Sequence, residues 1–241
     1  MDIILTGASF ASNSYKPLAI SYFPFIFRDA EHQLKYAQSD VFRELAAGYD
    51  KASGNHIVAL NYYGARHVTS SRPITKPEDM KGLKIRVPDA PAYLAFPKAL
   101  GANPTPIAFA EVYLALQNGT VEAQENPLPT IEAKKFYEVQ KNISLTGHIV
   151  DALLTVVSGQ TWSKLSDADK KIFTEVMEEA GDKAGREIAA SEVRLVDEFK
   201  KKGNNVIVVD KNAFRDAVLK TTKPADQGYR QQDYDRIVNI K

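Results

Sequence analysis

Apolar and polar residues alternate along a short segment in the first half of the chain. Leu83, Ile85 and Val87 are apolar, whereas the two residues between them, Lys84 and Arg86, are cationic. A period of two is typical of a β-strand, and here it predicts one apolar face and one cationic face. A proline follows directly and ends the predicted strand.

Helical spacing follows this strand. The pattern predicts a helix over residues 89–100, with Asp89 as its N-cap and Gly101 as the residue after its end. A second helix is predicted over residues 109–116, where apolar side chains recur at helical intervals. The polar run Gln124–Pro127 predicts a turn.

The same patterns extend over the rest of the chain. The capping box of Ser166 and Asp169 predicts the start of a helix that ends near Lys202, about 37 residues and roughly 55 Å long. The remaining expectations are a buried strand over 2–8, amphipathic helices over 30–51, strands over 57–63 and 143–154, and short elements over 206–209, 211–219 and 231–237. Strands that alternate with helices predict an α/β fold.

Composition narrows the function classes. The chain has 241 residues, of which 44% are hydrophobic and 25% charged, enough for one large domain or two smaller ones. The net charge of +1 argues against a nucleic-acid partner. No segment has the apolar length of a membrane span. The lack of cysteine excludes disulfides and thiolate chemistry.

Enzyme signatures are missing from the sequence. We find no nucleophile elbow, phosphate-binding loop, dinucleotide fingerprint or zinc-protease motif. The four histidines are scattered, with no pair at metal-ligand spacing. We therefore expect no catalytic residues, no metal site, no cofactor and no enzymatic activity.

Arg86 and Arg66 are the candidate binding residues. If the strand of Arg86 is covered on both faces, its guanidinium needs an anionic partner, and a ligand can be that partner. The alternative is an edge strand that leaves Lys84 and Arg86 in water. Arg66 follows the strand predicted over 57–63, and its sequence context alone predicts a surface residue.

Several motifs carry a family resemblance. They are GLKIRVP at residues 82–88, ALGANPTPIAFAEVYLALQNG at 99–119, VEAQENP at 121–127 and KKFYEVQK at 134–141. Together they resemble the signature of the DctP family, the extracytoplasmic solute-binding proteins of tripartite ATP-independent periplasmic (TRAP) transporters. The resemblance extends from about Asp2 to Ile149 and is greatest to the sialic-acid-binding branch.

This resemblance implies a two-domain, periplasmic-binding-protein-like fold of type II with a long domain-spanning helix. Residues 1–63 plus 152–191 would form domain I, and 64–151 plus 192–241 domain II. In the family, the segment that matches DIILTGAS follows an earlier strand, helix and strand. We therefore expect an incomplete first domain here, and no export signal is visible. The expected state is a monomer, with strand exchange between chains favoured by the absent elements.

The resemblance also assigns a binding site. Arg86 would form a bidentate bridge to a ligand carboxylate and Arg66 would assist, because a planar guanidinium matches a carboxylate in geometry. Asn126 would hydrogen-bond the same group or a neighbouring hydroxyl. Phe109 would form a wall of the pocket, and Asp89 would bind ligand hydroxyls.

The implied function is a periplasmic receptor that delivers a small organic acid to the TRAP membrane subunits. Gly7 stands where the sialic-acid branch has an acidic residue, and Asp89 suits hydroxyl groups. A sugar acid such as a uronate or an aldonate is therefore favoured. The alternatives are a C4-dicarboxylate or sialic acid receptor, a truncated protein that binds nothing, and an enzyme acting on a carboxylic acid.

Overall fold

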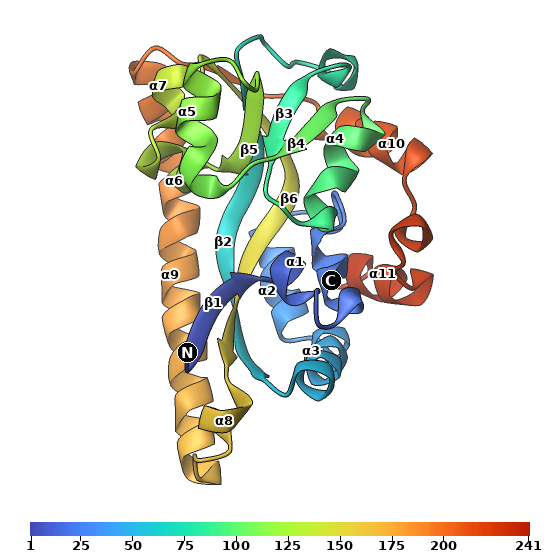
Figure 1. The fold of residues 1–241 in the computed structure, drawn as a ribbon, viewed down its shortest axis with the longest axis vertical. Coiled ribbons are helices and arrows are strands. Elements are labelled where there is room, and N and C mark those ends of the chain that lie inside the picture. The colour runs from blue at the N-terminus through green and yellow to red at the C-terminus, as the bar shows by residue number, and fades with distance from the viewer.

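The computed structural model describes residues 1–241 and is built on one mixed β-sheet (Figure 1). The strand order is β1-β6-β2-β5-β3-β4, and β7 pairs with β6. Strand β3 is parallel to β4 and β5, and β7 is parallel to β6, whereas the other pairs are antiparallel. The strands are β1 Ile3–Gly7, β2 His56–Ser70, β3 Lys84–Val87, β4 Asn103–Pro106, β5 Ala123–Pro127, β6 Asn142–Val157 and β7 Asn205–Ile207.

Helices cover the sheet. The longest, α9, runs along much of the length of the molecule (Figure 1) and confirms the predicted long helix, with Ser166 as N-cap accepting the Asp169 N–H. The helices are α1 Ala8–Ala11, α2 Ala30–Ala37, α3 Asp40–Ser53, α4 Ala95–Ala99, α5 Val112–Gln117, α6 Leu128–Ala133, α7 Phe136–Val139, α8 Gly159–Trp162, α9 Asp167–Lys201, α10 Lys211–Thr221 and α11 Gln231–Val238. Short 3-10 helices span Lys16–Tyr22, Pro77–Met80, Pro91–Leu94, Phe109–Glu111 and Pro224–Gln227.

Two long strands connect the halves of the molecule. Strands β2 and β6 have 15 and 16 residues and pair along their length, with register shifts that include Tyr62/Gly64 and Arg66/Val68. Gly64 has a φ of +119°, a region that favours glycine. Beside it, the Ala65 N–H donates to Glu192 Oε1 at 2.7 Å, which ties α9 to β2 one residue before Arg66.

Three hydrophobic clusters form the core. The first and largest contains 25 buried residues, contributed mainly by the elements between β1 and β2 and by the half of β6 that faces them. The second gathers around β3, α4 and α10, and the third around α5, α6, α7 and the C-terminal part of α9. The fold is thus the mixed α/β architecture that the sequence predicted.

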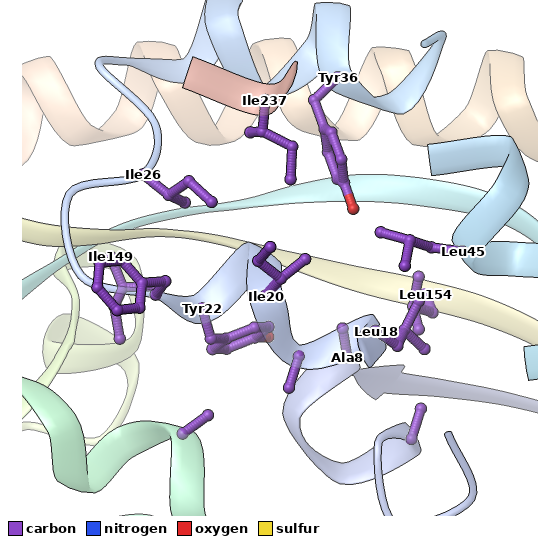
Figure 2. Close-up of a cluster of buried hydrophobic side chains, with 14 of the residues drawn as sticks. Ala8, Leu18, Ile20, Tyr22, Ile26, Tyr36, Leu45, Ile149, Leu154 and Ile237 are labelled. Atoms are coloured by element: carbon purple, nitrogen blue, oxygen red, sulfur yellow. The ribbon is translucent and has the colours of Figure 1, made fainter. Parts of the chain in front are cut away.

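The C-terminal helix packs in the first cluster. Figure 2 shows Ile237 of α11 beside Tyr36 of α2, and Tyr229 belongs to the same cluster. Ile237 and Tyr229 fall in the range 192–241, which the sequence resemblance places in domain II. The domain boundaries stay predictions, and these two contacts bear directly on where the second boundary lies.

The predicted turn at Gln124–Pro127 is wrong. These residues form the buried strand β5, which pairs antiparallel with β2 and parallel with β3. Their polar side chains are satisfied by hydrogen bonds inside the protein: Gln124 Nε2, for example, donates to Thr69 Oγ1 at 2.9 Å. A polar sequence can therefore form a central strand here because other strands supply its partners.

Two further predictions need correction. The strand over 2–8 exists as β1, but it is an exposed edge strand, with Ile3, Ile4 and Leu5 exposed by 43%, 43% and 58%, because only β6 pairs with it. The helix over 89–100 is broken into a 3-10 turn and α4. Its N-cap position is Ala90, so Asp89 does not cap it.

Candidate functional site

A cavity of about 330 Å³ lies where β3 and β4 end. Ligands in α/β proteins commonly bind at the carboxyl ends of parallel strands. All five residues that the sequence resemblance assigned to the site line this cavity. The full lining is Gly7, Phe10, Tyr63, Arg66, Arg86, Pro88, Asp89, Tyr93, Ile107, Ala108, Phe109, Asn126, Asp151 and Leu153.

Arg86 is held in place by the chain's own backbone. Strand β3 is paired on both sides and Arg86 is only 2% exposed, which excludes the solvated edge strand. Its Nε and Nη2 both donate to the Ile107 carbonyl, at 3.0 and 2.8 Å. Its Nη1 is buried and has no hydrogen-bond partner. The guanidinium therefore keeps N–H groups available for an anion at the cavity.

Arg66 is bound to side chains of the protein. It is 3% exposed, so the surface alternative is excluded as well. Its Nε and Nη2 donate to the two carboxylate oxygens of Glu125, and its Nη1 donates to Asp151 Oδ2 at 2.7 Å. Nη2 also reaches Asn126 Oδ1 at 3.1 Å. Arg66 thus pairs with two buried carboxylates and retains little donor capacity of its own.

The two arginines differ accordingly in their electrostatics. Burial works against the charge of Arg66, but Glu125, Tyr93 and Asp151 outweigh it and raise its pKa well above the ordinary value. Burial lowers the pKa of Arg86 to about 10, because Glu125 compensates only in part and Arg66 repels it. Both side chains are cationic at neutral pH. Arg86 is the one whose desolvation is only partly compensated within the protein.

The other three predicted residues lie around this pair. The Asn126 amide accepts from Arg66 and donates to Gln124 Oε1 at 2.6 Å, which fixes its orientation. The Phe109 ring centroid lies 5.7 Å from the Arg86 guanidinium carbon and forms an aromatic wall. Asp89 is exposed at the cavity and makes no hydrogen bond or ion pair.

Sequence reasoning missed part of the site. The sequence pattern places Glu125 in a turn and does not indicate Asp151 as a ligand-site residue, although both carboxylates bind Arg66. Tyr93 lies under Arg66, with 4.9 Å between the guanidinium carbon and the ring centroid. The available signal was the alternation of apolar and polar residues over 121–124, which also fits the start of a strand.

Buried histidines make the fold sensitive to acid. Burial lowers the pKa of His67 to about 3, and it also lowers the pKa of His148. His67 Nδ1 accepts the Gly147 N–H at 3.0 Å, so the imidazole is neutral. In the unfolded chain a histidine takes up its proton near pH 6.5. The unfolded state therefore binds more protons below that pH, and stability should fall as pH falls from about 6.5 toward 3.

We expect His67 to account for about 2 kcal/mol of lost unfolding free energy between about pH 7.5 and 5. Urea unfolding at the two pH values measures this loss. The variant His67→Asn keeps an acceptor for the Gly147 N–H without a titrating group, so its stability should depend less steeply on pH. An equally steep loss in this variant would contradict the assignment.

The structure also bears on metals and membranes. No group of three or more His, Asp or Glu side chains is arranged to hold a metal ion. None of the helices combines the length and the apolar character that a membrane span requires.

Comparison with known proteins identifies relatives. The chain is 41% identical over 208 residues to the sialic acid-binding periplasmic protein SiaP of Vibrio cholerae, an alignment that covers 86% of this chain and 65% of the relative. A TRAP periplasmic solute-binding protein from Polaromonas sp. JS666, solved with D-erythronate, has a TM-score of 0.93 and 34% identity, over 100% of this chain and 80% of that one. A second, from Roseobacter denitrificans, was solved with 3-deoxy-D-manno-oct-2-ulosonic acid and has a TM-score of 0.94 and 29% identity, over 100% and 81%.

The chain spans a little under two thirds of the length of the Vibrio cholerae relative. The family described as bacterial extracellular solute-binding protein, family 7, matches residues 1–227. This match covers almost the whole chain and agrees with the motifs found at residues 82–141. The chain therefore belongs to family 7 of the bacterial extracellular solute-binding proteins, the DctP family.

Proposed function

We propose that this chain is the periplasmic receptor of a TRAP transporter and that it binds a small organic acid, preferably a sugar acid, through Arg86. One observation carries the proposal: the Nη1 of Arg86 is buried at the cavity and has no partner within the protein. A buried, unpaired guanidinium is unfavourable, and a carboxylate is the small group that best satisfies it.

Each lining residue has a role in this proposal. The carboxylate forms hydrogen bonds with Arg86, and Asn126 supplies a further donor from its amide. Phe109 closes one side of the site beside the guanidinium. Asp89 accepts hydrogen bonds from ligand hydroxyls. Arg66 assists indirectly, because it holds Asn126 and Glu125 in place and adds positive charge near the ligand.

The relatives favour hydroxylated acids. The names of the three relatives described above mention sialic acid, D-erythronate and 3-deoxy-D-manno-oct-2-ulosonic acid, and each of these has one carboxylate and several hydroxyl groups. The cavity has one available guanidinium, that of Arg86, and one exposed carboxylate at its rim, that of Asp89. This pair suits a ligand with one carboxylate and several hydroxyl groups. The membrane subunits of the transporter would be the partners, reached after closure of the two predicted domains around the acid.

Binding is favoured over catalysis by the cavity lining. It contains no Ser, Cys, Lys or His, so a serine, cysteine or lysine nucleophile and an imidazole base are all missing from it. The carboxylate of Asp151 is occupied by Arg66 and Tyr22. We therefore propose transport rather than an enzymatic reaction.

A thermal-shift screen tests the proposed function. The panel comprises sialic acid, uronates, aldonates, C4-dicarboxylates and 2-oxo acids, each paired with a neutral alditol or amide where one exists. An acid at a hundred times its dissociation constant adds about 2.7 kcal/mol of stability, so we expect one acid class to raise the melting temperature clearly. A cooperative melt that no acid shifts would contradict the proposal.

A further inference from the structure

The site contains a balanced set of buried charges before any ligand enters. Two cations, Arg66 and Arg86, and two carboxylates, Glu125 and Asp151, are each at most 3% exposed. His148 contacts Glu125 Oε2 at 3.2 Å, but burial lowers its pKa, so it adds no positive charge at neutral pH. The buried part of the site is therefore neutral overall, and one ligand carboxylate makes it negative by one charge.

Only one of the two cations can accept a ligand anion fully. Arg66 donates from all three of its nitrogens to Glu125, Asp151 and Asn126, which leaves it at most one of its five N–H groups. Arg86 uses two N–H groups on the Ile107 carbonyl and keeps the others. The free N–H groups of the two arginines are therefore enough to bind one ligand carboxylate.

The remainder of the cavity is unfavourable to a second negative charge. Asp89 presents an exposed carboxylate to the same cavity and has no cationic partner. Lys134 lies 5.3 Å from the Phe109 ring centroid, but it is not part of the cavity lining. A dianion bound to Arg86 would place its second charge in a space of about 330 Å³ that holds carboxylates and no further free cation.

We propose that the site selects monoanions over dianions, with the rim carboxylate of Asp89 as the determinant of that selection. The substrate class is then a hydroxylated monocarboxylate, whereas C4-dicarboxylates, aldarates and phosphate monoesters are rejected. This inference rests on the proposed function, because it takes Arg86 as the anchor of the ligand. It adds the preference for monoanions over dianions, which we call the charge rule and which binding to Arg86 does not by itself imply.

A matched pair of acids tests the rule by isothermal titration calorimetry. D-erythronate and meso-tartrate share one carbon skeleton and differ in that a terminal CH₂OH of the first is a carboxylate in the second. We expect the parent chain to bind the monoanion at least about tenfold more tightly. If another aldonate binds better in the screen, that aldonate and its aldarate form the pair. Succinate and sn-glycerol 3-phosphate serve as further dianions.

The variant Asp89→Asn tests the determinant. It removes the rim charge but keeps a polar side chain, so the ratio of the two affinities should fall by about tenfold or more at low salt, mainly through tighter binding of the dianion. Asp182→Asn is the matched control, because Asp182 is an exposed carboxylate on α9, outside the cavity. It should leave the ratio unchanged.

The outcomes separate the two proposals. Equal affinity of the parent for the two acids of the pair overturns the charge rule and leaves the receptor function standing. An unchanged ratio in Asp89→Asn overturns the role of Asp89. A chain that melts cooperatively and binds no acid of either charge counts against the proposed function itself.

Discussion

Replacement of Arg86 by alanine should weaken acid binding by roughly 30-fold to several thousand-fold. This range corresponds to the 2–5 kcal/mol that is lost when one partner of a buried, hydrogen-bonded charge pair is removed. The carboxylate would enter the same cavity and find no guanidinium, since the donors of Arg66 are taken by Glu125 and Asp151. Isothermal titration calorimetry with the acid that shifts the melt most measures the change.

The folded state should tolerate this substitution. Arg86 is a desolvated cation whose only hydrogen bonds go to the Ile107 carbonyl, so the loss of stability should stay within about 1–2 kcal/mol. Arg86→Lys is the matched control: it keeps the charge but not the planar fork, and it should bind with intermediate affinity. Parent-like affinity in Arg86→Ala would show that the anchor lies elsewhere.

Replacement of Arg66 by methionine should act on stability first. Methionine roughly fills the volume of the aliphatic stem, but it leaves the carboxylates of Glu125 and Asp151 buried without their cation. Removing one partner of a buried ion pair costs about 3–5 kcal/mol. Urea unfolding of the ligand-free chain measures the loss.

A surface arginine provides the comparison for this variant. Arg43 pairs with Asp40 on an exposed face of α3, so Arg43→Met should leave the unfolding midpoint close to that of the parent. If Arg66→Met unfolds like the parent and loses only acid binding, then Arg66 binds the ligand directly. The roles assigned here to Arg66 and Arg86 would then be wrong.

Regular elements were predictable where the pattern is local. The alternation at residues 83–87 predicts β3, and Ser166 with Asp169 predicts the start of α9, because each depends on neighbours a few residues away. Strand β5 was not predictable in this way. Its polar side chains are satisfied by residues such as Thr69, 55 positions earlier in the chain, and no local pattern records such a partner.

The family resemblance names residues that the structure places around one cavity, and their roles toward a ligand stay predictions. The resemblance groups Arg66, Arg86 and Asn126, and all three line the same cavity in the structure. Which arginine is available to a ligand depends on Asp151, which lies 85 residues beyond Arg66 in the sequence and contacts it only in the fold. Residue type and spacing do not predict the contact between Arg66 and Asp151.

Exposure was equally hard to predict. Asp89 suits an N-cap by its type and its position two residues before Pro91, yet Ala90 is the N-cap residue and Asp89 lies at the cavity. Strand β1 has the apolar composition of a buried strand, but it lies at the edge of the sheet. In both cases the deciding factor is the position of the residue in the assembled sheet, not its immediate neighbours.

The most direct measurement is a crystal structure of this chain with the acid that raises its melting temperature most. We expect the ligand carboxylate within about 3 Å of Arg86 Nη1, with Arg66 still bound to Glu125 and Asp151. A carboxylate bound to Arg66, with Arg86 Nη1 left without a partner, would contradict the central claim.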